Sequence, residues 1–83
     1  MRIHPSARKH QLTDDAIRHA WDNALGYFTI DADTEPPKSL CIGPDPAGNL
    51  IELLYLELDD TELLIHAMPL RPAFRACLTG DKP

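Results

Sequence analysis

The run LIELLYLEL, from Leu50 to Leu58, constrains the fold more than any other segment. Apolar residues at both odd and even positions are typical of a strand that is covered on both faces or packed beneath a loop. PDPAGN precedes the run and DDT follows it, and proline, aspartate, asparagine and glycine are the residues that turns favour. We therefore expect residues 39–68 to form an antiparallel meander of three strands, SLCIG, LIELLYLEL and ELLIHAM.

The segment before this meander predicts two helices and one further strand. Pro5 suits the first position of a helix, and PSARKH can form one short helix or a few turns before Gln11. Thr13 is a good N-cap for a second helix, and the acidic residues that follow it favour the positive end of a helix. That helix is expected to run to about Leu25, because Gly26 ends it. The residues YFTID then form a short strand.

The C-terminal segment predicts one last helix, since Pro72 suits its first turn and PAFRACL follows. A chain of 83 residues is too short for two hydrophobic cores, so we expect a single domain over residues 1–83. The predicted fold class is α+β. It has a small antiparallel sheet of three to four strands, two N-terminal helices and one C-terminal helix, with the helices on one face of the sheet.

Charge is distributed unevenly along the chain, whose net charge is −5. Residues 2–21 and residues 63–83 each carry +2, whereas residues 22–62 carry −9. A fold that brings the two ends together would place a positive surface on an acidic protein. The alternative is that these are solvated charges without a common role.

Several classes of site and location are not supported by the sequence. No apolar run approaches the length of a membrane span and no secretory signal is recognisable, so we expect no membrane partner and a cytoplasmic location. Cys41 and Cys77 are then expected to be buried thiols. The glycines do not form a phosphate-binding loop, and the histidines and cysteines lack the spacing of a metal site. We expect no cofactor and no metal.

The residue types that remain suit cleavage of a phosphodiester. Cutting RNA with its own 2′-hydroxyl needs a base, an acid and cations around the phosphate, and it needs neither a protein nucleophile nor a metal. Histidine can supply the proton transfer, and the arginine guanidinium fits phosphate oxygens. The candidate residues are His66, Arg71 and His10 for catalysis, and Arg8, Lys9 and Arg75 for binding of RNA phosphate.

A structural interpretation of the same residues stays open. His66 lies in a predicted strand, where a packed and hydrogen-bonded histidine is common. Arg71 and Arg75 are four residues apart, as on a solvated helix face. Lys9 and His10 can form the exposed end of a helical turn.

Three segments resemble the BrnT family of bacterial toxins. ARKH, followed by Gln11, an apolar residue and a threonine, is similar to the family's Lys-His-Gly region before an acidic helix. CIGPDPAGNLIELLYLEL resembles its strand, turn and long apolar strand, and ELLIHAMPLRPAFR stands where its last strand and basic terminal helix are found. Lys9 and His10 match the Lys-His pair, and the region of Arg71 and Arg75 matches the basic helix.

The resemblance implies a compact RelE-like fold, a metal-independent ribonuclease and neutralisation by a small cognate antitoxin. Two departures from the family pattern are Gln11 in place of glycine, and AMP where the last strand usually reads ARK. The leading hypothesis is the toxin of a type II toxin-antitoxin system, an endoribonuclease that binds RNA and an antitoxin. The alternative is a catalytically inactive RelE-like scaffold that acts as a protein-interaction module, either with a partner or as a homodimer.

Overall fold

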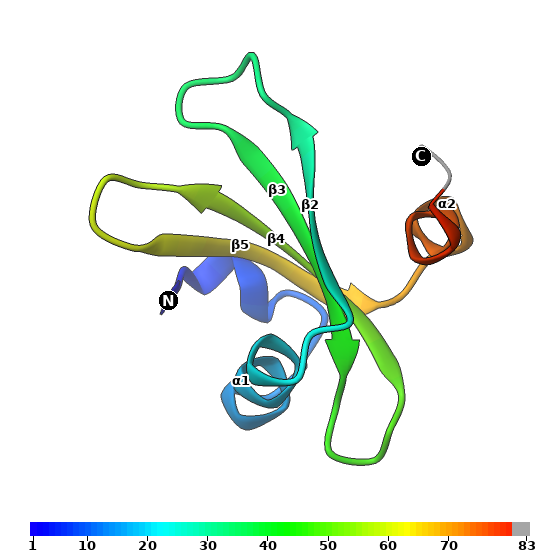
Figure 1. Cartoon of the computed structure of the whole chain (residues 1–83). Helices are drawn as coiled ribbons and strands as arrows, with labels where there is room; N and C mark the ends of the chain where they lie inside the picture. Colours follow the sequence, from blue (N-terminus) through cyan, green and yellow to red (C-terminus); the bar gives the residue numbers. More distant parts are fainter. Residues whose placement is uncertain (81–83) are drawn as a thin grey trace.

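The computed structural model describes residues 1–80, which form one mixed sheet of five strands with short helices on both sides (Figure 1). The strand order across the sheet is β1-β5-β4-β3-β2. The strands are β1 (Arg2–Ile3), β2 (Gly26–Asp31), β3 (Lys38–Pro44), β4 (Leu50–Glu57) and β5 (Glu62–Pro69). The helical segments are η1 (Pro5–Arg8), α1 (Asp14–Asp22), α2 (Pro72–Arg75) and η2 (Ala76–Thr79), of which η1 and η2 are 3-10 turns.

The predicted meander is present as β3, β4 and β5, which pair in antiparallel fashion. The strand β2 pairs with β3 and extends the sheet on one side. On the other side β1 pairs in parallel with β5, with Arg2 opposite Leu63 and Ile3 opposite Leu64. Within residues 1–80 the first and last strands are therefore neighbours.

The predicted RelE-like layout is wrong, as the sheet has five strands and is mixed. Of the two expected N-terminal helices only α1 is an α-helix, because the first is the 3-10 turn η1. A segment as short as η1 cannot propagate an α-helix, and Gln11 follows it with a positive φ of 64°. The expected C-terminal helix is a four-residue α-helix that continues as a 3-10 turn and stops at Gly80, whose φ is 87°.

The larger core cluster lies between the sheet and α1. The Thr13 side chain accepts a hydrogen bond from the backbone N–H of Ala16 at 3.1 Å, as expected of the predicted N-cap. The helix ends at Asp22, three residues before the predicted end. The buried residues of this cluster are Ala7, Ile17, Ala20, Cys41, Ile51, Leu53, Tyr55, Leu64 and Ala67.

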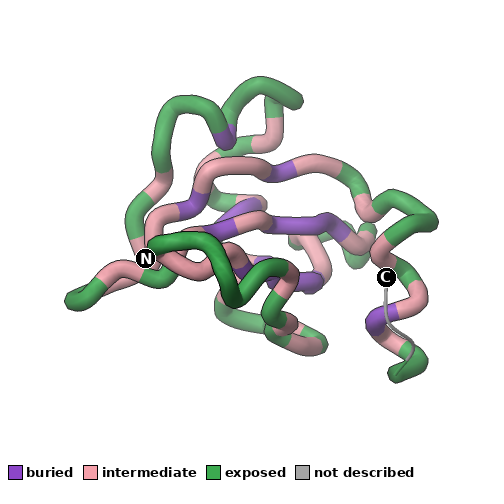
Figure 2. The backbone as a smooth tube through the Cα atoms, turned by 90° about the horizontal axis from the view of Figure 1, so that it is seen from above, coloured by how far each residue is buried: buried purple, intermediate pink, exposed green. Residues whose placement is uncertain are grey.

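A second, smaller cluster lies on the opposite face of the sheet, where Phe74 and Leu78 pack against buried Leu40, Ile42 and Cys77. The expectation that all helices cover one face is therefore wrong. Figure 2 shows buried residues along the strands at the centre of the molecule, whereas the turns between them are exposed. Two covered faces explain why β4 is apolar at both odd and even positions.

The contact between α1 and β3 is unusually close at Gly43. A side-chain Cβ built at this glycine would overlap the backbone carbonyl group of Ala20 in α1. The obstacle is backbone, so it cannot be relieved by rotation of a side chain. The helix can approach the sheet this closely because residue 43 has no side chain.

We expect Gly43→Ala to lower the free energy of unfolding by about 1–3 kcal/mol, because α1 must move away from the sheet. Urea unfolding followed by circular dichroism measures the change. Ala47→Ser, which adds one atom at an exposed turn position, is the control and should change the free energy by less than about 0.5 kcal/mol. Equal stability of Gly43→Ala and the wild type would contradict the close approach.

Candidate functional site

The site is built around Glu52, the only carboxylate among residues 1–80 that is fully buried. Glu52 lies in the central strand β4, opposite Ile42 on one neighbouring strand and Met68 on the other. Its side chain is 0% exposed. A buried carboxylate is strongly unfavourable unless it is paired and hydrogen bonded, so its partners define the local structure.

Arg71 donates most of the hydrogen bonds that Glu52 accepts. Its backbone N–H donates to Glu52 Oε1 at 2.8 Å. Its guanidinium donates from Nε to both carboxylate oxygens, at 3.1 and 3.0 Å, and from NH2 to Oε2 at 2.7 Å. Arg71 precedes Pro72 and has the extended backbone that this position favours, with ψ of 150°. Its guanidinium also lies 5.2 Å from the centre of the Phe74 ring.

His66 is the other partner of Glu52. Its Nε2 lies 3.1 Å from Glu52 Oε2, and its side chain is 23% exposed. The pairing of β4 and β5 shifts by one residue at this point, because Leu54 is opposite His66 while Tyr55 is opposite Leu64. Before this shift the register is regular from Glu52–Met68 to Leu54–His66, so strand alternation places His66 on the same face of the sheet as Glu52.

The pKa values of the site follow from this network. Burial would raise the pKa of Glu52, but the hydrogen bonds from the Arg71 side chain and backbone outweigh it and the pKa lies below its ordinary value. Burial lowers the pKa of His66, and the hydrogen bond to Glu52 opposes this shift only in part. The hydrogen bond to Glu52 raises the pKa of Arg71, whose charge is therefore permanent.

These directions assign the proton positions in the network. An ionised Glu52 can only accept hydrogen bonds, so the hydrogen of a neutral His66 must be on Nε2. The lone pair is then on Nδ1, to which no group in residues 1–80 donates a hydrogen bond. Glu52 thus holds the His66 ring in the tautomer that leaves Nδ1 as a free base.

His10 reaches the same place from the other end of the chain. The η1 turn is fixed against β5, because the Ser6 hydroxyl donates to the carbonyl of Ile65 at 2.7 Å and the backbone N–H of His4 donates to that of Leu64 at 2.8 Å. His10 follows this turn, and its ring centre lies 5.5 Å from that of His66 with the planes at 78°. Two imidazoles from residues far apart in the sequence are therefore edge to face.

The structure thus brings the three predicted catalytic residues together, and it places the predicted phosphate-binding residues differently. Arg8 is engaged by Asp14, with Nε to Oδ1 and NH2 to Oδ2 both at 3.0 Å. Lys9 is exposed next to His10 and has no ion pair among residues 1–80. Arg75 lies one helical turn beyond Arg71 and lines a separate hollow.

Glu52 was not among the predicted site residues, although the sequence carries a signal for it. Glu52 is the one charged residue within the otherwise apolar segment from Leu50 to Leu56. A charge in the middle of a strand with two covered faces requires a cationic partner. By charge alone Glu52 is one of the many acidic residues of segment 22–62, most of which are not buried.

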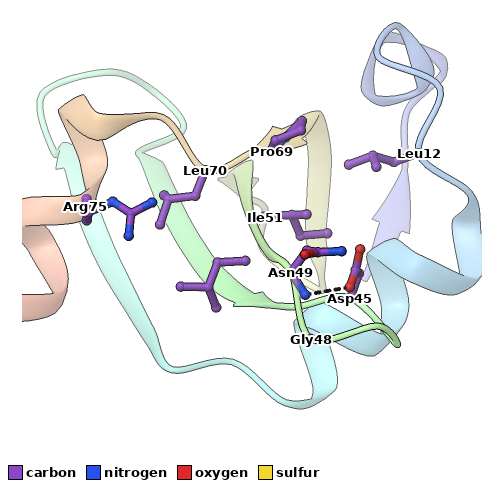
Figure 3. A pocket seen from close by; sticks show the side chains of 9 residues that line it. Leu12, Asp45, Gly48, Asn49, Ile51, Pro69, Leu70 and Arg75 are labelled. Atoms are coloured by element: carbon purple, nitrogen blue, oxygen red, sulfur yellow. Dashed lines mark hydrogen bonds between the residues drawn. The ribbon is translucent and has the colours of Figure 1, made fainter.

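A hollow of about 520 Å³ opens beside this network (Figure 3). Arg75 enters it from one side, and Asp45 and Asn49 from the turn between β3 and β4 lie at the other. Its remaining lining residues are Leu12, Gly48, Leu50, Ile51, Pro69 and Leu70. Ile51 directly precedes Glu52 and Leu70 directly precedes Arg71, so the hollow adjoins the two segments that carry this ion pair.

The arrangement is suited to proton transfer. His66 offers a free base at Nδ1, His10 offers a second titratable ring, and the Arg71 side chain is 45% exposed and permanently cationic. Within residues 1–80 no three His, Cys, Asp or Glu side chains are grouped so that they could hold a metal ion. No helix in that range is long and apolar enough to cross a bilayer.

Comparisons with known proteins identify no relative. No protein-family model matches the chain, and searches of curated proteins and of solved structures find no significant match.

The pKa directions of Glu52 and His66 predict how stability depends on pH. Both values lie below the ordinary ones of 4.5 and 6.5, so the unfolded chain takes up protons at a higher pH than the folded chain does. The free energy of unfolding should therefore decrease as the pH falls, first below about 6.5 through His66 and then below about 4.5 through Glu52. Urea unfolding at a series of pH values measures both steps.

Two variants separate these steps. His66→Gln keeps a donor for Glu52 without a titrating ring, so it should remove the first step. Glu52→Gln should remove the second step and lower stability at neutral pH by about 1–3 kcal/mol. Glu35→Gln, in an exposed loop, is the control and should retain both steps. A wild-type stability that is constant from pH 7 to pH 4 would contradict the assignment.

Proposed function

We propose that the protein is a metal-independent endoribonuclease that cleaves RNA through its own 2′-hydroxyl. The observation that carries this proposal is the edge-to-face pair of His10 and His66, at 5.5 Å, with Glu52 behind one of the two rings. The reaction needs one group that takes a proton from the 2′-hydroxyl and another that gives a proton to the leaving oxygen, and two imidazoles can supply both. In this proposal both the acid and the base are histidine side chains, so the reaction requires no metal.

In the proposed reaction His66 Nδ1 takes the proton from the 2′-hydroxyl, and the 2′-oxygen forms a bond to the adjacent phosphorus. The bond from phosphorus to the 5′-oxygen breaks, and protonated His10 gives its proton to that oxygen. The products are a 2′,3′-cyclic phosphate and a free 5′-hydroxyl. The exposed part of the Arg71 guanidinium lies beside His66 and stabilises the charge on phosphorus.

We further propose that this activity is that of the toxin in a type II toxin-antitoxin system. Support for this part comes from the sequence resemblance to the BrnT family at ARKH and at the C-terminal segment. The proposed partner is a small antitoxin. The acidic segment of residues 22–62, with a charge of −9, would attract basic parts of such a partner.

A second candidate function is that of a protein-interaction module without catalysis. Leu25 and Tyr27 are the two large apolar residues that are most exposed among residues 1–80, at 59% and 52%. Tyr27 lies in β2 and Leu25 directly precedes it, and β2 is an edge strand of the sheet. An exposed strand edge with apolar side chains can pair with a strand of an antitoxin or of a second copy.

Cleavage of an RNA oligonucleotide by the purified protein tests the ribonuclease proposal. We expect products with 2′,3′-cyclic phosphate ends, and no cleavage of the same sequence made with 2′-O-methyl riboses. His66→Ala and His10→Ala should each lower the rate about a hundredfold or more. The rate should depend on pH as a bell-shaped curve.

His19→Gln is the matched control for this experiment. His19 is also a histidine with a ring hydrogen bond, from Nδ1 to the carbonyl of Pro44 at 2.8 Å, but it lies on α1 away from the pair. The variant should cleave RNA at the wild-type rate. Absence of cyclic-phosphate products at high protein concentration, or equal rates for His66→Ala and the wild type, would refute the ribonuclease.

The interaction module makes the opposite prediction. If binding through β2 is the function, Leu25→Asp should abolish the complex with a co-expressed antitoxin or the dimer of the chain, because a charge on the apolar edge blocks pairing. His66→Ala should then leave complex formation unchanged. Size-exclusion chromatography with light scattering measures both. A Leu25→Asp variant that forms the same complexes as the wild type would exclude this surface.

A further inference from the structure

The hollow between the β3–β4 turn and Arg75 has the composition of a nucleotide site. Its volume of about 520 Å³ lies within the range of small-molecule sites, roughly 300–1,000 Å³. Apolar groups from Leu12, Leu50, Pro69 and Leu70 form its walls. The flat face of a base can lie against such walls, so the polar groups at the ends decide the orientation.

The two charged residues of the hollow, Arg75 and Asp45, are opposite in sign and lie on opposite sides of it (Figure 3). The Arg75 guanidinium has no acidic partner among residues 1–80 and is exposed, so it is available for a phosphate. Asp45 repels a phosphate at the other side. A nucleotide in this hollow therefore places its phosphate at Arg75 and the hydrogen-bonding edge of its base at Asp45.

Asp45 is fixed by its own turn. Its Oδ1 accepts the backbone N–H groups of Ala47 and Asn49, at 3.0 and 2.8 Å. Its Oδ2 accepts no hydrogen bond from residues 1–80 and can still take two donors. The position of the free oxygen is therefore set before any ligand binds.

The donor pattern selects one base. A carboxylate oxygen is an acceptor only, so it favours a base edge that presents donors side by side. Guanine presents its ring N–H and its amino group next to each other on one edge. Adenine and cytosine place a ring acceptor beside the amino group, and uracil places its single N–H between two carbonyls. A carboxylate repels each of these acceptors.

We propose that this hollow binds one guanine nucleotide of an RNA strand, with Asp45 reading the base and Arg75 holding a phosphate. The inference rests on the proposed ribonuclease function and names its substrate preference. Ile51 precedes Glu52 and Leu70 precedes Arg71 in the chain, so the lining of the hollow is continuous with the segments that carry the Glu52–Arg71 pair. The RNA strand that is cleaved would then carry a guanine in this hollow.

Calorimetric titration with the four nucleoside 3′-monophosphates and with inorganic phosphate tests this site without any need for cleavage. We expect guanosine 3′-monophosphate to bind about tenfold or more tightly than the other three nucleotides. Asp45→Asn keeps an oxygen for the two backbone N–H groups but presents an amino group in place of Oδ2, so it should abolish that preference. Arg75→Gln should weaken all four nucleotides by a similar factor.

Equal affinity for all four nucleotides, or an unchanged preference in Asp45→Asn, would overturn the guanine site. Inorganic phosphate that binds as tightly as the guanine nucleotide would show an anion site only and would also overturn it. The outcomes for the two proposals are distinct. Guanine-selective binding without RNA cleavage supports the guanine site and refutes the ribonuclease. RNA cleavage with equal affinity for the four nucleotides supports the ribonuclease and refutes the guanine site.

Discussion

The Glu52 carboxylate, buried beneath the Arg71 guanidinium, is the interaction on which the rest of the structure depends. It joins the central strand β4 to the segment that leaves β5, and it takes the backbone N–H of Arg71 as well as its side chain. Because a lone carboxylate could not remain at 0% exposure, the entry of the chain into α2 is coupled to the sheet. The Arg71 side chain stays 45% exposed, so only the Glu52 carboxylate of this ion pair is fully removed from water.

The same carboxylate has a chemical consequence. By accepting a hydrogen bond from Nε2 of His66 it fixes both the orientation and the tautomer of that ring. The group that stabilises the fold is then also the group that leaves a free base at Nδ1. His10 completes the pair through η1, a turn fixed by Ser6 on the edge of β5. Structure and proposed chemistry share one buried charge, and a change to Glu52 affects both.

Local signals in the sequence were sufficient for some elements and insufficient for others. Thr13 as an N-cap and the three strands of the meander were predicted correctly, because capping and turn residues act within a few positions. The parallel pairing of β1 was not foreseen, since two residues carry no periodicity and their partner lies at the other end of the chain. His10, His66 and Arg71 were candidates by residue type and lie together, whereas Glu52, which connects two of them, was not a candidate. Whether Glu52 is buried depends on what covers its face of the sheet. That face is covered by Arg71 and the α2 segment, which follow much later in the sequence.

The place of β1 in the sheet has a consequence for the order of events during synthesis. Its partner β5 is the last of the five strands within residues 1–80 to leave the ribosome, and the η1 turn rests on the same strand. Residues 1–10 must therefore wait without these partners until residues 62–69 have emerged. His10 and His66 can meet only after that moment, so a nascent chain that ends before β5 lacks the histidine pair.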